Sequence, residues 1–338
     1  MIHLESGTGF SIAVLPYGAS WASCRVPMAD GSVREVLLGC ETESDYRSHP
    51  SYLGATIGRF ANRLKHGRFS IGGRAYAVDR NDGEHCLHGG CAGFGKRDWA
   101  IEELGTDRVR FSIVSADGDG GFPGQMTAET TYILNSHDSS VTIEFLAALD
   151  RPCPVSFTNH AYFNLDGDCH DSRGHSLQLS SEGFLPIDES GIPSGEILDV
   201  SGSPFDYRQR VPLLRASTAN AQLALNNGYN HAFLLAADCH AMRQSAAELV
   251  SADRLLVMRM FTTLPALHVY GGNYLAGSPA RGGGFYEDYA GIALEAEFPP
   301  DAPNHPEWPT PSCILYPGGI YRHCIRYCFE ARQDVNPA

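Results

Sequence analysis

Residues 130–146, TTYILNSHDSSVTIEFL, contain two short runs in which apolar and polar side chains alternate. The first run is Thr130–Leu134, the second is Val141–Leu146, and the polar segment Asn135–Ser140 separates them. Alternation with a period of two places one face of a β-strand against a core and the other face in water. This stretch therefore predicts two antiparallel strands joined by a turn, and it favours an all-β fold.

Strand-like segments of the same kind recur along the chain and are joined by turn-forming residues. Two further pairs are Trp21–Val26 with Val33–Leu38 and Phe69–Ile71 with Tyr76–Val78, and a strand-like run Leu255–Thr262 leads by way of Pro265 into another, Leu267–Tyr270. The turns Asp30-Gly31 and Gly72-Gly73 suit these two pairs because glycine adopts positive φ without a steric penalty. The 36 glycines and 20 prolines of the 338-residue chain also indicate many short elements joined by turns.

Helical periodicity is confined to two short segments. We expect one short helix over Glu41–Arg47, which Pro50 would stop, and another over Met242–Leu249. Neither is long enough to connect two parallel strands, so the sheets should be antiparallel. No shift of composition marks a domain boundary, and we therefore expect residues 1–338 to form a single large antiparallel β-sandwich domain.

The composition narrows the classes of partner. The chain has 25 Lys and Arg against 39 Asp and Glu, and the net charge of −14 is the wrong sign for binding nucleic acid or an anionic membrane. Its apolar runs, such as Ala232–Ala237, are far shorter than the roughly 20 residues of a membrane helix. The N-terminus does not resemble a signal peptide and the ten cysteines are mostly isolated, so we expect a cytoplasmic protein.

Two familiar motifs are incomplete in this chain. Residues 90–96, GCAGFGK, match the start of a phosphate-binding P-loop, but Arg97 occupies the position of the magnesium-binding Ser or Thr. His85 and His88 have cysteines nearby, but the spacing is not that of a zinc site, and residues three apart on a strand point to opposite faces. We therefore expect no structural metal.

Three segments are rich in polar groups without the even pattern of a solvated surface: residues 58–63 with 81–90, residues 158–165, and residues 294–309. His160 in such a segment is commonly a core histidine, whereas Glu295 and Glu297 share a strand face on which two unpartnered buried carboxylates would be costly. A His that donates a proton and a Glu that accepts one, on opposite sides of a small polyol, act as general acid and base without metal or cofactor. Such a pair suits proton transfer on a sugar.

Seven motifs follow one another along most of the chain. They are GRFANR (58–63), HCLHGG (85–90), GFGKRDW (93–99), TNHAYFNL (158–165), NGYNHAFLL (227–235), YGGNYL (270–275) and LEAEFPPDAPNHPEWP (294–309). In this order they resemble the signatures of the aldose 1-epimerases, also called galactose mutarotases. The resemblance implies a large antiparallel β supersandwich with a sugar-binding cleft, and a cofactor-free isomerase that interconverts the anomers of galactose and glucose.

The resemblance also implies roles for individual residues. His160 would be the general acid that protonates the ring oxygen, and Glu295 would be the general base that takes the proton of the anomeric hydroxyl. The ring would open to the aldehyde, rotate about the C1–C2 bond and close again with the roles reversed. His88, Asn62 and Arg63 would hold the oxygens of the sugar.

Four further residues complete the expected site. Tyr162 and Trp99 would line the cleft, and Asn230 and His268 would contact the sugar. The family commonly has Asp where Asn230 stands and Gln where His268 stands. Asn retains an acceptor without the charge that strengthens hydrogen bonds to hydroxyls, and His268 adds a titratable group, so the preferred sugar and the pH dependence need not follow the family.

Other functions remain open at this stage. A carboxylate that faces an acid also cleaves glycosidic bonds, usually with a second carboxylate opposite, and the same sandwich is compatible with a non-catalytic sugar-binding protein. A variant acting on hexose 6-phosphates would use Arg59, Lys65 or Arg68 as phosphate ligands. The expected partner is a small sugar, with no nucleic acid and no membrane, and the sequence allows either a monomer or a homodimer.

Overall fold

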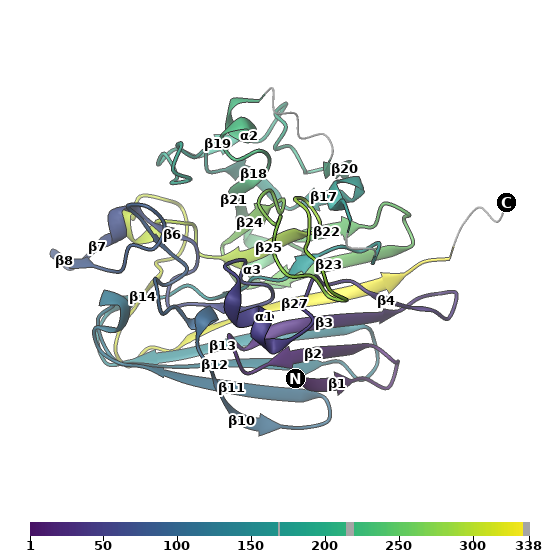
Figure 1. The fold of residues 1–338 in the computed structure, drawn as a ribbon. Coiled ribbons are helices and arrows are strands. Elements are labelled where there is room, and N and C mark those ends of the chain that lie inside the picture. The colour runs from purple at the N-terminus through teal and green to yellow at the C-terminus, as the bar shows by residue number, and fades with distance from the viewer. Residues whose placement is uncertain (168–169, 214–219, 334–338) are drawn as a thin grey trace.

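The computed structural model describes residues 1–167, 170–213 and 220–333, which form antiparallel sheets with few and short helices (Figure 1). The largest sheet has nine strands in the order β10 (Ala100–Leu104), β11 (Arg108–Ser115), β12 (Met126–Leu134), β13 (Ser140–Leu149), β27 (Tyr321–Ala331), β23 (Leu256–Thr262), β22 (Ala247–Val250), β17 (Ser176–Leu179) and β20 (Val211–Pro212). All eight strand pairings in this sheet are antiparallel. The predicted all-β class and antiparallel pairing are confirmed.

Two further sheets pack near the first. One has six strands in the order β16 (Tyr162–Phe163), β25 (Ile292–Glu297), β24 (Ala266–Tyr270), β21 (Asn230–Leu235), β18 (Ser181–Phe184) and β19 (Leu198–Asp199). The other has four strands in chain order, β1 (Ile2–Glu5), β2 (Ser11–Leu15), β3 (Ser20–Pro27) and β4 (Val33–Glu35). Short ladders join β5 (Thr56–Ile57) to β15 (Thr158–Asn159), β6 (Arg63–Leu64) to β9 (Cys86–Leu87), β7 (Arg68–Ile71) to β8 (Arg74–Ala77), and β14 (Cys153–Pro154) to β26 (Ile314–Leu315).

Aromatic side chains fill the space where the three large sheets meet. Trp21 of β3 lies 5.3 Å from the ring of Tyr327 of β27 and 5.9 Å from that of Phe163 of β16, and the last two rings are 5.2 Å apart. All three side chains are fully buried. Since burying an aromatic side chain contributes on the order of 2 kcal/mol or more, this cluster holds the three sheets together.

The strand predictions were accurate where alternation and turn chemistry agreed. In the pair that contains residues 130–146, Leu134 of β12 lies opposite Val141 of β13, and buried residues alternate along β13. The hairpins β3–β4 and β7–β8 are also present. β4 is shorter than predicted and ends at Glu35, whose carboxylate accepts hydrogen bonds from the backbone N–H groups of Cys24 and Leu37.

The helix predictions had mixed outcomes. A short helix, α1 (Glu43–Ser48), is present, and Thr42 and Asp45 form a reciprocal capping box at its start. The predicted helix over Met242–Leu249 is wrong. A single helical turn, α3 (Ala237–His240), ends before this segment, and the segment runs into strand β22, which is hydrogen-bonded on both sides by β17 and β23. The ladder of two neighbouring strands outweighs a weak local helical pattern.

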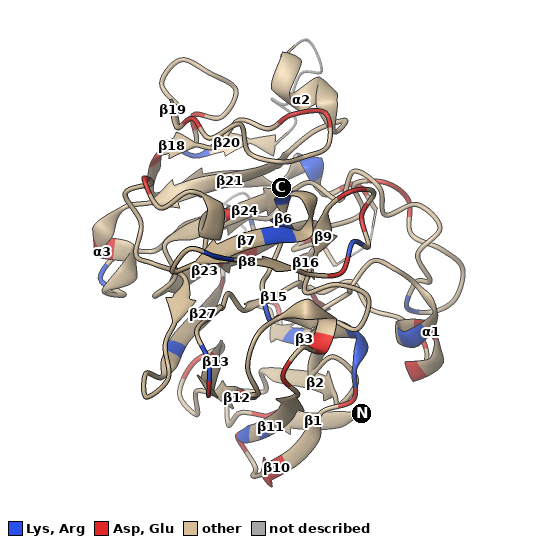
Figure 2. Cartoon of the chain, turned by 90° about the vertical axis from the view of Figure 1, so that its left-hand side faces the viewer, with Lys and Arg blue, Asp and Glu red and all other residues tan. Residues whose placement is uncertain are grey.

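The charged residues are spread over many elements rather than concentrated on one (Figure 2). On the nine-stranded sheet, Arg259 of β23 pairs across strands with Glu248 of β22 and Glu330 of β27. These groups are partly exposed, so such pairs contribute little to stability. The described residues include no helix that is long and apolar enough to span a membrane.

Candidate active site

Of the two candidate catalytic residues, Glu295 lies on a strand of the six-stranded sheet and His160 lies in the short connection between β15 and β16. His160 directly follows β15 and is separated from β16 by Ala161, and its backbone N–H donates a hydrogen bond to the carbonyl of Ala55. Glu295 lies within β25, and in the neighbouring β16 Tyr162 is paired with Ala293. Because cross-strand partners and residues two apart share a face, the side chains of Tyr162 and Glu295 point to the same side of the sheet.

These side chains open into a cleft of about 230 Å³. Eight residues were predicted from the sequence to be catalytic or sugar-binding, and all of them line this cleft: Asn62, Arg63, His88, His160, Tyr162, Asn230, His268 and Glu295. They come from strands β6, β16, β21, β24 and β25 and from the segments beside them. The fold therefore brings together residues from six segments of the chain, between positions 62 and 295.

His160 and Glu295 face each other directly. The Nε2 atom of His160 is 3.5 Å from the Oε2 atom of Glu295, and the two side chains are only 6% and 2% exposed. The ring of His160 is also flanked by aromatic rings, with Tyr162 at 4.9 Å and Tyr52 in a stacked arrangement at 6.2 Å. The pair is thus fixed in orientation and almost completely shielded from water.

Burial sets the protonation of this pair. It raises the pKa of Glu295 to about 8, although the positive charge of Arg63 acts to lower it. It lowers the pKa of His160 to about 4. The short separation by itself would favour an ion pair, but the loss of hydration outweighs the attraction because both groups are removed from water. At neutral pH the pair therefore consists of a protonated Glu295 beside a neutral His160.

His88 presents a hydrogen-bond donor to the cleft. The backbone N–H of Asn62 donates to Nδ1 of His88 at 3.1 Å, and the backbone N–H of His88 donates to the carbonyl of Asn62 at 3.0 Å. Since Nδ1 accepts a hydrogen bond, the proton of the neutral ring is on Nε2. Burial and the neighbouring His160 lower the pKa of His88 well below its ordinary value, so the ring stays neutral.

This tautomer bears on metal binding. Ligand atoms of His88, His160 and Glu295 lie within 4.8 Å of one another, which is close enough for three ligands of one ion. A histidine binds a metal through an unprotonated nitrogen and usually donates a hydrogen bond from its other nitrogen. His88 has the reverse arrangement, with Nδ1 occupied as an acceptor and Nε2 protonated. The donor set therefore suits the oxygens of a sugar better than a metal ion.

Arg63, Asn230 and His268 complete the polar lining. Nε of Arg63 donates to Oδ2 of Asp82 at 2.8 Å, which holds the guanidinium at the edge of the cleft. On the other side, Nε2 of His268 is 2.7 Å from Oδ1 of Asn230. His268 lies directly opposite Glu295 in the β24–β25 ladder. The two positions that differ from the common family pattern thus contact each other.

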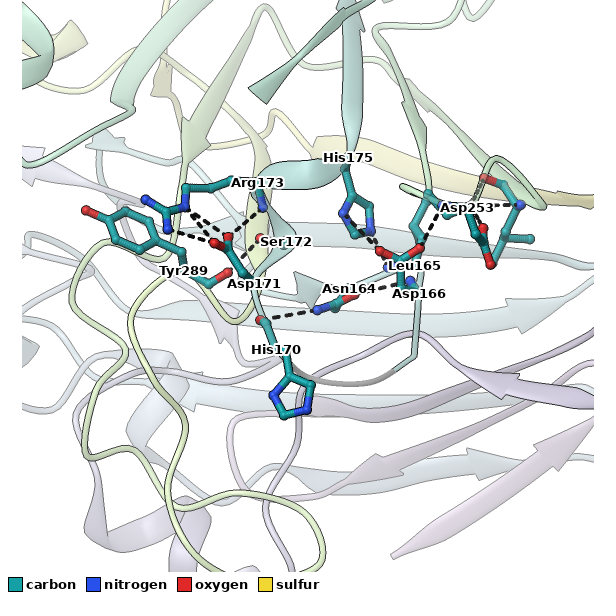
Figure 3. Close-up of polar contacts among 12 residues, drawn as sticks. Asn164, Leu165, Asp166, His170, Asp171, Ser172, Arg173, His175, Asp253 and Tyr289 are labelled. Carbon is teal, nitrogen blue, oxygen red and sulfur yellow. Dashed lines mark hydrogen bonds and ion pairs between the residues drawn. The ribbon is translucent and has the colours of Figure 1, made fainter. Parts of the chain in front are cut away.

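The segment after His160 is anchored by a second set of polar contacts (Figure 3). The backbone N–H of Leu165 donates to Nε2 of His175 at 2.8 Å, and Nδ2 of Asn164 donates to the carbonyl of Ala290 at 2.9 Å. His175 is fully buried, away from the cleft, and its Nδ1 atom is 3.8 Å from Asp166. This histidine has the structural role that was also conceivable for His160.

Comparison with known proteins agrees with this arrangement. A family model described as aldose 1-epimerase matches residues 1–328. The chain belongs to the aldose 1-epimerase family. It is 43% identical over 331 residues to the aldose 1-epimerase of Escherichia coli K12, an alignment that covers 98% of this chain and 95% of the relative. It is 33% identical over 321 residues to the galactose mutarotase of Sus scrofa, covering 94% and 91%.

Solved structures of this family share the fold. An aldose epimerase homologue from C. elegans superimposes with a TM-score of 0.90 at 28% identity, covering 98% of this chain and 99% of that one. A galactose 1-epimerase from Lactobacillus acidophilus gives a TM-score of 0.83 at 27% identity, covering 98% and 94%. The predicted galactose mutarotase-like sandwich is confirmed.

Two predictions about aldose 1-epimerase site residues need correction. Trp99 does not line the cleft: it is 3% exposed, packs on Phe94 at 5.5 Å and donates its Nε1–H to the carbonyl of Phe94. Arg59 is not available as a phosphate ligand, because it is 2% exposed and its guanidinium donates to a hydroxyl and four carbonyls. Its acceptors are provided by Ser115, Ala116, Pro123 and Gly124. Arg59 instead joins the loops around the nine-stranded sheet.

The sequence reasoning missed several lining residues. Tyr52, Asn226, Tyr270 and Tyr274 also border the cleft. Tyr270 and Tyr274 lie in the YGGNYL motif, which resembles a family signature but suggested no role for either tyrosine. Tyr52 and Asn226 lie outside all seven motifs, and only the folded chain places them beside the cleft.

Proposed function

We propose that this member of the aldose 1-epimerase family interconverts the α and β anomers of aldohexoses such as galactose and glucose. The proposal rests chiefly on one observation, the opposition of His160 and Glu295 at 3.5 Å in a cleft lined by polar side chains. The names of the relatives, aldose 1-epimerase and galactose mutarotase, support it. The enzyme is accordingly an isomerase.

In the proposed reaction, Glu295 removes the proton of the anomeric hydroxyl while His160 donates a proton to the ring oxygen. The C1–O5 bond breaks, and the anomeric carbon becomes an aldehyde. Rotation about C1–C2 presents the other face of the carbonyl. His160 then takes back the proton of the O5 hydroxyl as O5 attacks C1, and Glu295 returns its proton to O1, so each residue acts once as acid and once as base.

The proton count of the pair stays at one throughout the pyranose-binding and ring-opening steps. The pyranose requires a charged Glu295 and a protonated His160, whereas the open aldehyde is matched by a protonated Glu295 and a neutral His160. The pKa shifts of the two residues favour a protonated Glu295 and a neutral His160. The cleft thus favours the protonation state that accompanies the aldehyde, and hydrogen bonds from the sugar must compensate for the charged state.

The remaining lining residues have matching tasks in this proposal. Nε2–H of His88 and the guanidinium of Arg63 donate to sugar oxygens, as does the side-chain amide of Asn62. Asn230 and His268 contact hydroxyls on the opposite side. The ring of Tyr162 covers an apolar face of the pyranose.

The rival function of glycosidic cleavage lacks its second carboxylate. Among the described residues that border the cleft, Glu295 is the one acidic side chain, and Glu297 is buried and does not border the cleft. Cleavage of a glycosidic bond usually needs a pair of carboxyl groups that flank the bond. The cleft lining therefore favours proton transfer within one sugar.

The structure also bears on the setting of this activity. The cysteines that the structure describes all have free thiols, which supports the proposal of a reducing compartment such as the cytoplasm. One hydrophobic core extends from Leu4 to Phe329, which supports the proposal of a single domain.

The proposed function is tested by following the optical rotation of freshly dissolved α-galactose. His160→Gln and Glu295→Gln should each reduce the enzymatic rate by a factor on the order of 100 to 10,000, because neither amide transfers protons. The matched controls His137→Gln and Glu144→Gln alter exposed residues of the opposite sheet and should leave the rate unchanged. Parent-like relaxation by either cleft variant contradicts the assigned roles.

A further inference from the structure

A second carboxyl group, Glu297, lies buried beside residues that line the cleft. It follows Glu295 by two residues on β25, its side chain is fully buried, and it is not part of the cleft lining. Its Oε1 atom accepts a hydrogen bond from Nδ2 of Asn62 at 3.0 Å. The proposed reaction gives this carboxyl group no proton to transfer. Burying a carboxyl group costs free energy unless hydrogen bonds compensate for the lost hydration.

Through Asn62, Glu297 supports one wall of the cleft. Asn62 has a left-handed backbone with φ of 64°, a conformation that asparagine adopts more readily than most other non-glycine residues. The backbone of the same residue fixes the tautomer of His88 by donating to Nδ1. The side-chain hydrogen bond to Glu297 therefore helps to hold the donor that His88 offers to the sugar.

On the other side, Glu297 lies beside His268. Nδ1 of His268 is 4.0 Å from Oε1 of Glu297, and Nε2 of His268 is hydrogen-bonded to Asn230. Within the described residues, Nδ1 of His268 and Oε2 of Glu297 are buried and have no hydrogen-bond partner. Glu297 is thus placed between the wall formed by Asn62 and His88 and the wall formed by Asn230 and His268.

The surroundings of Glu297 favour its uncharged form. Burial and the nearby carboxyl group of Glu295 raise its pKa well above the ordinary value, while the hydrogen bond from Asn62 and the charge of Arg63 act in the opposite sense. On the opposite sheet, Tyr321 of β27 also lies near enough for its pKa to be affected by Glu297. Burial likewise lowers the pKa of His268, so both members of the contact are neutral at neutral pH.

We propose that Glu297 is a positioning residue of this active site, which links the two walls of the cleft in the arrangement that binds the sugar. It acts as a neutral acid, and its ionisation would place a second negative charge near Glu295. Sugar binding should then weaken as the pH rises through the pKa of Glu297. This inference rests on the proposed function, because it assumes that the cleft binds a sugar.

The first test measures the roles of geometry and charge with two variants. Glu297→Gln retains an oxygen for Asn62 but cannot ionise, whereas Glu297→Leu removes the acceptor. Glu297→Leu should raise KM about tenfold or more, the effect of leaving a buried donor unpaired, with a smaller change in kcat. Glu297→Gln should keep KM near the parent value at neutral pH. A KM for Glu297→Leu within a factor of about two of the parent value overturns the proposal.

The second test separates the ionisation of Glu297 from that of Glu295. Galactose binding is measured by calorimetry in Glu295→Gln and in Glu295→Gln/Glu297→Gln, from neutral to alkaline pH. Affinity should fall with rising pH in the single variant and stay constant in the double variant. The same fall in both variants overturns the proposal, even if Glu297→Leu fails to fold.

These outcomes are distinguishable from failure of the proposed function. If the parent protein binds galactose without accelerating mutarotation, the proposed function fails, but the calorimetric comparison still decides the role of Glu297. Glu35→Gln is the matched control, because Glu35 is a half-buried carboxylate that accepts backbone hydrogen bonds in the four-stranded sheet, away from the cleft. It should alter neither KM nor the pH dependence of binding.

Discussion

The pH dependence of mutarotation should report the unusual protonation of the His160–Glu295 pair. The pair holds one proton between the lower pKa of about 4 and the upper pKa of about 8. We therefore expect kcat/KM to be constant between these limits. Below the lower limit His160 and Glu295 are both protonated and no base remains, and above the upper limit both have lost their protons and no acid remains. Outside the plateau the rate should fall about tenfold per pH unit.

The same values give the energetic cost of the reactive state. Moving the proton from Glu295 to His160 costs about 1.4 kcal/mol for each unit that separates the two pKa values, before the attraction between the resulting charges is counted. For values near 4 and 8 this gives an upper limit of about 5 kcal/mol, because the transfer also creates opposite charges 3.5 Å apart whose attraction offsets part of the cost. The transfer changes no proton count, so it lowers the rate equally at every pH on the plateau. Hydrogen bonds from sugar oxygens to the charged forms should offset part of this cost.

The assay is polarimetry of α-galactose at low substrate concentration, because kcat/KM reports the pKa values of the free enzyme. The spontaneous rate at each pH must be subtracted. Infrared spectroscopy of the sugar-free protein at neutral pH should in addition show a protonated carboxyl band that Glu295→Gln removes. An upper limb near 6.5, the ordinary pKa of histidine, together with no band lost in Glu295→Gln, would refute the burial argument.

Two further predictions concern stability. Arg59→Met should lower the free energy of unfolding by about 3 kcal/mol or more, because it leaves buried carbonyl groups without a donor. The control Arg322→Met, at an exposed position of β27, should change the free energy of unfolding by less than about 0.5 kcal/mol. Both are measured by urea denaturation. Gly54→Ala should lower the free energy of unfolding by about 2 to 4 kcal/mol, because φ is +68° and the new Cβ would lie 1.9 Å from the carbonyl oxygen of Trp21. At Gly72 φ is +56° and nothing lies within 4 Å of the new Cβ, so Gly72→Ala should lower it by about 1 kcal/mol. Equal losses at both positions would contradict the steric argument.

The local structure was predictable where one short pattern contained all the information. The hairpin over β7 and β8 needs only two apolar runs and the Gly72-Gly73 turn, and α1 needs only its capping residues and the proline that follows. The segment Met242–Leu249 was misassigned because its conformation depends on hydrogen bonds to β17 and β23, which are distant in sequence. Strand formation at such a site is a property of the partners.

The site residues show the same division. Their identities could be inferred from motifs, and all eight line one cleft, but Trp99 belonged to a motif and is nevertheless buried in the core. Tyr52 borders the cleft without belonging to any motif. A motif marks a segment that matters, but the direction of each side chain depends on packing.

From the order of its residues alone, the chain specified antiparallel strands, the turns between them and a set of ionisable groups suited to sugar chemistry. The tertiary structure decided how those groups ionise, because the pKa values of His160, Glu295 and Glu297 depend on how completely other strands exclude water from them. It also decided which groups meet, since the contact of Asn62 with Glu297 joins two segments from opposite ends of the chain. Desolvation and contact are properties of the assembled sheets, and no short stretch of sequence contains them.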